Sequence, residues 1–169
     1  MCVYFESFSK EHFKDKRVIE LGSGIGLLGI ALSTICKSVV MTDLPKMLDI
    51  LKRNFERNKS LFCQQKPFLY SVTSLEWNNK TEIQNLNPPF DIIVGSDITY
   101  EEEHIPSLVE TLLQLSNDDT EIFIGYEERK MSSESLFFKL VEVHFEITET
   151  VDVRNLHDSI PNGPPQVQK

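Results

Sequence analysis

The chain has 169 residues, a length typical of a single domain, and no internal repeat or linker divides it. Its hydrophobic content is 40% with 25% charged residues, and no apolar run approaches the ~20 residues that a membrane helix needs. The formal net charge of −9 disfavours nucleic acid and favours a basic partner, because polyanions are bound mainly through Lys and Arg.

The cysteines and histidines predict neither a disulfide framework nor a metal site. Cys2, Cys36 and Cys63 are odd in number and include no Cys-x-x-Cys pair, so their expected role is packing in a reducing compartment. We therefore expect a cytoplasmic protein, with the nucleus as the alternative compartment. The histidines are too scattered to suggest metal ligands: His12, His104, His144 and His157.

Strands and helices alternate in the first half of the chain. Apolar residues recur at helical spacing after Ile25, and Pro45 suits the first turn of a helix. The predicted elements are a strand at Val18–Leu21, a helix at about Ile25–Cys36, a strand at Ser38–Thr42, a helix from Pro45 toward Asn58, and a strand near Phe68–Val72.

The second half continues this alternation and then ends in a tail. The predicted elements are a turn at Asn87–Pro89, a strand at Phe90–Val94, a helix at Ile105–Leu115, a strand at Glu121–Gly125, a helix capped by Ser132–Ser135, and a sixth strand at Phe145–Val153. The Pro-containing segment 154–169 predicts a loop-like or disordered tail, so no seventh strand is evident.

This alternation predicts a doubly wound, Rossmann-like α/β fold. Its sheet would be mostly parallel, with helices on both faces. We expect a single domain over residues 1–153, with a short N-terminal region and without the final strand.

A glycine-rich turn follows the first predicted strand. Gly22, Ser23 and Gly24 lie before the first long helix and Gly26 lies in its first turn, where glycine allows positive φ and a close approach to a ligand. The helix N-terminus presents unpaired N–H groups to the same place. Asp43 follows the second strand, where its carboxylate can accept hydrogen bonds from two ribose hydroxyls. This layout predicts an adenosine-bearing cofactor.

Two classes of cofactor fit this layout. Gly24–Gly29 matches Gly-x-Gly-x-x-Gly, the pattern that binds the pyrophosphate of a dinucleotide. Glu20 lies two residues before the first glycine, where an anion disfavours a pyrophosphate but suits the ammonium of a methionine moiety. We therefore predict S-adenosylmethionine, and a nicotinamide-dependent oxidoreductase stays as the alternative.

Four motifs follow one another along the chain: Val18–Gly26, Leu75–Trp77, Asp91–Tyr100 and Tyr126–Arg129. The third motif ends in Asp-x-x-Tyr. In this order the motifs resemble those of the seven-strand, class I S-adenosylmethionine-dependent methyltransferases, in their protein-lysine branch. The resemblance covers roughly residues 12–153.

The resemblance implies roles for residues beyond the glycine turn. It places Asp97 and Tyr100 where they would orient an incoming amine beside the methyl group. Glu101–Glu103 is expected to form an exposed acidic turn ahead of a helix. The implied site residues are Asp97 and Tyr100 for catalysis, Trp77 for the cofactor, and Glu127 and Arg129 for the substrate. Ser96 adjoins the same cleft, and we expect it to contact the cofactor through its backbone.

Together with the resemblance, these patterns predict methyl transfer to a lysine ε-amine of another protein, without a metal. The expected partner is a protein with an accessible lysine, rather than nucleic acid or a membrane. Two alternatives stay open, because a fold does not fix a function. One is a non-catalytic binding module with a methyltransferase-like fold, and the other is a methyltransferase for another class of substrate.

Overall fold

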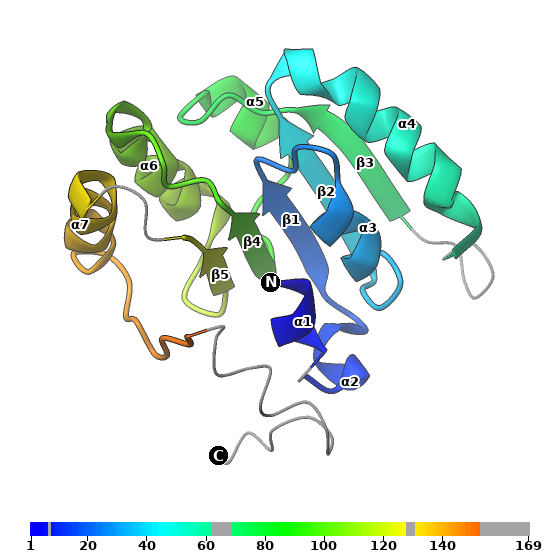
Figure 1. The fold of residues 1–169 in the computed structure, drawn as a ribbon, viewed down its shortest axis with the longest axis horizontal. Helices are drawn as coiled ribbons and strands as arrows, with labels where there is room; N and C mark the ends of the chain where they lie inside the picture. The colour runs from blue at the N-terminus through cyan, green and yellow to red at the C-terminus, as the bar shows by residue number, and fades with distance from the viewer. Residues whose placement is uncertain (7, 62–68, 128–130, 153–169) are drawn as a thin grey trace.

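The computed structural model describes residues 1–6, 8–61, 69–127 and 131–152, and its centre is a single sheet (Figure 1). Five strands, all parallel, lie in the spatial order β3-β2-β1-β4-β5. Their bounds are Arg17–Leu21 for β1, Ser38–Asp43 for β2, Leu69–Ser74 for β3, Ile92–Ser96 for β4 and Glu121–Gly125 for β5. A parallel sheet of this kind needs cover on both faces.

Helices supply that cover on both faces (Figure 1). One face carries α1 (Cys2–Phe5), α2 (Lys10–Phe13), α3 (Leu27–Leu32) and α4 (Leu48–Asn58), with single 3₁₀ turns at Pro45–Met47 and Lys59–Leu61. The other face carries α5 (Lys80–Asn85), α6 (Ile105–Leu115) and α7 (Met131–Val141), with a 3₁₀ turn at Glu102–His104 before α6. The predicted doubly wound α/β fold is therefore confirmed.

The apolar runs of the central strands divide between two hydrophobic cores. Val18 and Val94 pack against the helices α1–α4, whereas Ile19, Leu21 and Ile93 pack against α5–α7. Successive side chains of a strand point to opposite faces, so a strand covered on both sides is mostly apolar, and the buried polar residues Glu20 of β1 and Thr42 of β2 are exceptions.

The strand order reverses at β1, and this reversal positions the site. From β1 the chain proceeds outward through β2 to β3, and it then returns to place β4 on the other side of β1. Leu21 at the end of β1 pairs with Gly95 of β4. In open α/β sheets, ligands bind beside the carboxyl ends of the strands at such a reversal.

Several predicted boundaries differ from the observed ones. The helix predicted at Ile25–Cys36 is shorter at both ends: α3 begins only at Leu27, because Gly26 has a φ of +88°, and it ends at Leu32. β4 begins two residues later than predicted, and Phe90 before it is buried in the core. The cap predicted at Ser132–Ser135 is wrong, since these residues lie inside α7. Phe68, predicted in the third strand, lies outside the described residues.

The predicted sixth strand is wrong for residues 145–152, which contain no strand. Alternation of apolar and polar residues does not suffice, since a strand also needs a neighbouring strand to share its hydrogen bonds. Ile147 and Val151 are exposed instead, and Glu149 accepts a hydrogen bond from the Tyr4 hydroxyl of α1 at 2.9 Å. The predicted tail at 154–169 lies outside the described residues.

Candidate functional site

The glycine turn, residues 22–26, connects β1 to α3 at the carboxyl edge of the sheet. Gly22, Gly24 and Gly26 have φ angles of +62°, +55° and +88°. The Ser23 amide donates to the Thr42 carbonyl of β2 at 2.9 Å, and the Gly26 amide donates to the Ser23 carbonyl at 2.8 Å. The turn is thus a left-handed loop held against the end of the neighbouring strand.

Asp43 ends β2 and is tied to the glycine turn. Its Oδ2 accepts a hydrogen bond from the Gly24 amide at 2.7 Å, and its Oδ1 accepts one from the Leu44 amide at 2.7 Å. A carboxylate can accept about four hydrogen bonds, so each oxygen retains a lone pair for a ribose hydroxyl. Asp43 is half-buried beside the turn, as the predicted ribose contact requires.

Glu20 lies beneath the glycine turn, with only 3% of its surface exposed. Its Oε2 accepts a hydrogen bond from the Gly29 amide of α3 at 3.1 Å. Burial raises the pKa of Glu20 to about 7; Ser23 and the Gly29 amide oppose this rise, and Asp43 adds to it. The carboxyl group is therefore close to half-ionised at neutral pH.

The turn fits the cofactor that the sequence predicts. Beside Gly24, a side chain would meet no atom within 4 Å, so a ligand can approach its backbone. The Ser23 Oγ is buried and has no hydrogen-bond partner of standard geometry in the described part of the chain, although it lies close enough to lower the pKa of Glu20. An unpaired buried hydroxyl is costly unless a ligand or water completes it. These features fit the methionine and ribose parts of S-adenosylmethionine.

The acceptor turn, residues 97–100, follows β4 on the other side of the strand-order reversal. Asp97 has a left-handed φ of +60°, and its amide donates to the Gly125 carbonyl of β5 at 2.7 Å. Asp97 and Tyr100 are exposed, whereas Ile98 and Thr99 between them are buried. The turn therefore presents a carboxylate and a phenol to solvent at the sheet edge, next to the exposed Ser96.

Trp77 lies beyond the end of β3, on the same edge of the sheet. It is half-buried, packs against the core under α5–α7, and meets the His104 ring edge-on at 6.4 Å. The structure thus gives Trp77 a packing role, and its predicted contact with adenine stays a prediction.

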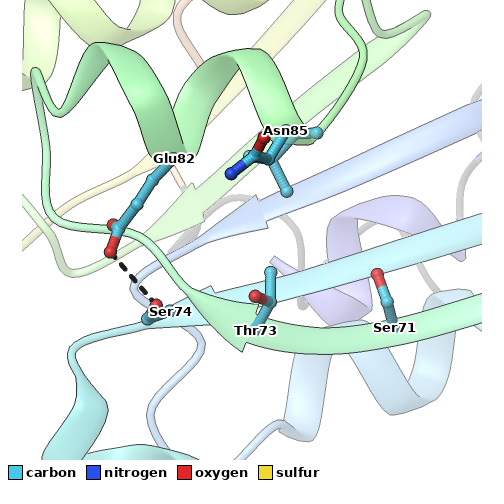
Figure 2. Close-up of a pocket in the computed structure, with 6 residues that line it drawn as sticks. Ser71, Thr73, Ser74, Glu82 and Asn85 are labelled. Carbon is cyan, nitrogen blue, oxygen red and sulfur yellow. Dashed lines mark hydrogen bonds between the residues drawn. The ribbon is translucent and has the colours of Figure 1, made fainter.

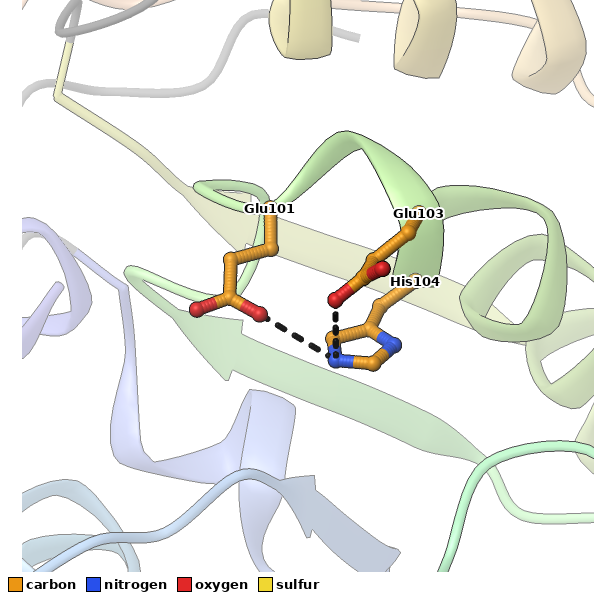
Figure 3. Close-up of side chains that lie close together, drawn as sticks. All are labelled: Glu101, Glu103 and His104. Atoms are coloured by element: carbon orange, nitrogen blue, oxygen red, sulfur yellow. Dashed lines mark ion pairs between the residues drawn. The ribbon is translucent and has the colours of Figure 1, made fainter.

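The acidic turn predicted ahead of a helix is present before α6 (Figure 3). The His104 Nε2 lies 3.2 Å from Glu101 and 3.8 Å from Glu103, which are ion pairs when the imidazole is protonated. Their ligand atoms all lie within 4.8 Å of one another. All three side chains are substantially exposed, and local pairing between near neighbours in sequence explains the arrangement.

The predicted substrate-side pair is only half described. Glu127 is exposed two residues after β5, and Arg129 lies outside the described residues. Among the other predicted residues, the structure brings Glu20, the glycine turn and Asp43 together, and it places the acceptor turn after the adjacent strand β4.

A separate pocket of about 440 Å³ lies at the outer edge of the sheet (Figure 2). Its lining comes from β3 and α5 and includes none of the predicted site residues: Ser71, Thr73, Ser74, Glu82, Asn85 and Leu86. The carboxylate of Glu82 is occupied by the Ser74 hydroxyl and by the Glu76 amide. By its lining, this pocket is separate from the predicted site residues at the strand-order reversal.

One contributor to the site was missed at the level of sequence. Thr42 is buried, and its hydroxyl donates to the Glu20 carbonyl at 2.7 Å while its own carbonyl accepts from Ser23. It thereby joins β2 to Glu20 of β1 and to Ser23 of the glycine turn. The sequence did offer a signal for this role, since Thr42 is a polar residue between the apolar part of the strand and Asp43.

Comparison with known proteins identifies the family. A family model described as lysine methyltransferase matches residues 1–144. The chain is 33% identical to protein N-lysine methyltransferase METTL21A of Danio rerio, covering 90% of this chain and 71% of that protein. It is also 33% identical to EEF1A lysine methyltransferase 3 of Xenopus tropicalis, covering 95% and 67%.

A plant relative extends the range of matches. Calmodulin-lysine N-methyltransferase of Arabidopsis thaliana is 32% identical, and the match covers 96% of this chain but 55% of the plant protein. Among solved structures, an O-methyltransferase from Bacillus cereus in complex with SAH has a TM-score of 0.58 at 21% identity, covering 76% of this chain and 63% of that one. At this identity the likeness supports the fold alone. From the family match and the close relatives, the chain belongs to the lysine methyltransferase family, whose methyl donor is S-adenosylmethionine.

Proposed function

We propose that the chain methylates a lysine ε-amine of a protein at the carboxyl ends of β1, β2 and β4. One observation supports this most strongly. The glycine turn with Asp43 and the acceptor turn with Asp97 flank the strand-order reversal, in a chain of the lysine methyltransferase family.

The cofactor half of the proposal assigns a role to each group around the glycine turn. When bound, S-adenosylmethionine supplies an electrophilic methyl group carried on a sulfonium. Asp43 would accept the ribose hydroxyls, and the exposed backbone at Gly24 would lie against the ligand. Glu20 would pair with the ammonium once ionised, and Ser23 would offer its unpaired hydroxyl.

The acceptor half assigns the approach of the amine to Asp97 and Tyr100. A lysine amine has a pKa near 10.4 in water, so its neutral form must be favoured before it can attack. Asp97 would hold the amine through a hydrogen bond and accept its proton, while Tyr100 would flank the side chain. Glu127 and Arg129 would contact the segment around the target lysine.

Titration calorimetry tests the cofactor half first. We expect the chain to bind S-adenosylmethionine and S-adenosylhomocysteine, and Asp43→Ala to weaken both about tenfold or more, which is about 1.4 kcal/mol. Lys46→Ala, an exposed change nearby, is the matched control and should not alter affinity. Binding of NAD in place of both sulfur compounds would overturn the assignment.

Transfer of a radiolabelled methyl group tests the acceptor half. The names of the Xenopus and Arabidopsis relatives make EEF1A and calmodulin the first proteins to try, followed by fractionated cell lysate. We expect label on lysine in a protein, and its loss in Asp97→Ala. Tight cofactor binding with no labelled protein, in every fraction tried, would favour the non-catalytic binding module instead.

A further inference from the structure

Ile98 lies inside the acceptor turn, between two residues that face solvent. Unlike Asp97 and Tyr100, it is buried, with 5% of its surface exposed. Its side chain joins the hydrophobic core shared by β1, β4 and the helices α5–α7. The side chain of Ile98 thus anchors the acceptor turn to this hydrophobic core, and Thr99 beside it is buried as well.

The side chain of Ile98 fills the space next to two glycines. A Cβ atom at Gly22, in the glycine turn, would lie 2.7 Å from Ile98 Cγ2. A Cβ atom at Gly95, in β4, would overlap Ile98 Cδ1 and lie 3.1 Å from its Cγ1. Ile98 is therefore in contact with the glycine turn through one methyl group and with β4 through the other.

We propose that Ile98 is a positioning residue that sets the spacing between the glycine turn and the acceptor turn. This inference rests on the proposed function, in which the first turn holds the cofactor and the second holds the amine. The reacting atoms of a methyl transfer must lie about 3–3.5 Å apart, and an error of about 1 Å can cost about 100-fold in rate. Because close-packed interiors transmit strain, a rigid side chain between the turns can hold that spacing.

A pair of substitutions tests the contact through cofactor binding. Gly95→Ala adds a methyl group that overlaps Ile98 Cδ1, and Ile98 can then transmit the strain to Gly22. We expect Gly95→Ala to weaken the binding of S-adenosylhomocysteine about tenfold or more. Ile98→Val removes Cδ1 and keeps Cγ2, so the double variant should bind to within about threefold of Ile98→Val alone.

Two controls separate this contact from general loss of packing. Ile83→Val removes the same methyl group from the same core, and it should not rescue Gly95→Ala. Gly22→Ala should not be rescued by Ile98→Val, because Cγ2 stays and the φ of +62° still opposes a side chain. If Gly95→Ala does not fold, Ile98→Ala is compared with Ile83→Ala at matched melting temperatures, and only Ile98→Ala should weaken binding.

The possible outcomes distinguish the inference from the proposed function. Failure of the unmodified chain to bind S-adenosylhomocysteine would overturn the proposed function itself. Normal binding in the unmodified chain, with the double variant as weak as Gly95→Ala, would overturn the role of Ile98 alone. Rescue in the double variant, without rescue in the two controls, would establish the contact.

Discussion

Glu20 is a carboxylic acid enclosed by protein at a site where a cationic ligand is expected. Burial raises its pKa to about 7 from an ordinary value of 4.5. The folded chain therefore binds more protons than the unfolded chain between these two values, and its free energy of unfolding falls as pH rises through that range. Above pH 7 the loss is complete and stays constant.

Replacing Glu20 with Gln should remove this loss. Gln keeps an acceptor for the Gly29 amide and carries no charge, so Glu20→Gln should be more stable than the unmodified chain at pH 8 by up to about 3 kcal/mol. At pH 4 the two should be equally stable. Denaturant unfolding at both pH values measures the difference, and equal stability at pH 8 would show that Glu20 is ionised at little cost.

Asp97 has a left-handed backbone conformation, so two substitutions can distinguish its contribution to stability from its contribution to catalysis. Asn tolerates a φ of +60° about as well as Asp, whereas Ala in this region costs about 1–2 kcal/mol. Asp97→Asn should therefore keep the melting temperature and the affinity for cofactor, while kcat falls about 100-fold or more. Asp97→Ala should lose stability as well. An unchanged kcat in Asp97→Asn would exclude the carboxylate from catalysis.

At the scale of elements, α5 depends on a cap. The Asn79 side chain accepts a hydrogen bond from the Glu82 amide at 3.2 Å, at the start of a helix of six residues. Asn79→Ala should lower the free energy of unfolding by about 1 kcal/mol, and Asn79→Asp should restore it. Denaturant unfolding checks both changes. Gln84→Ala, at an exposed position near the end of α5, is the control and should have almost no effect.

The spacing of apolar residues could predict helices and strands that bury one regular apolar face. It failed where an element depends on contacts with other parts of the chain. The helix Ile105–Leu115 and the strand Glu121–Gly125 are observed at the predicted bounds. The sixth strand alternates equally well, but in residues 145–152 it has no neighbouring strand. α5 is too short for helical periodicity, and only the Asn79 and Glu82 spacing signals its start.

In the candidate site, too, the features set by local sequence could be predicted, and those set by tertiary contacts could not. The positive φ angles of the glycine turn and the position of Asp43 follow from residue types and spacing, and both are observed. The depth of Glu20 beneath α3 could not be predicted, because it depends on how closely that helix approaches β1. The position of Ile98 could not be predicted either, because it contacts Gly22 and Gly95, which are 76 and 3 positions away in the sequence and come together only in the fold.

At the scale of the whole molecule, charge is divided unevenly. Residues 81–127 contain eleven acidic residues and no Lys or Arg, although the whole chain has 17 basic residues. Five of these acids follow β4 and β5 at the carboxyl edge of the sheet: Asp97, Glu101, Glu102, Glu103 and Glu127. None of the helices in the described ranges has the length and apolar character needed to cross a membrane.

This charge predicts how salt affects the reaction. A basic segment around the target lysine would be attracted to the acidic edge, and exposed charges separated by more than about 8 Å are largely screened at physiological salt. Between about 50 mM and about 300 mM salt, KM for a protein acceptor should therefore rise severalfold, while kcat changes little. Steady-state kinetics at several salt concentrations measure both constants.

Charge-reversal variants test whether the salt dependence of KM comes from the acidic edge of the sheet. Glu103 in the acidic turn and Glu11 in α2 have side chains 79% and 76% exposed, so they are a matched pair. Glu103→Lys should raise KM and reduce its dependence on salt, whereas Glu11→Lys should change neither by more than a small amount. Equal effects of the two variants would mean that only net charge matters, and that the acidic edge does not select the acceptor.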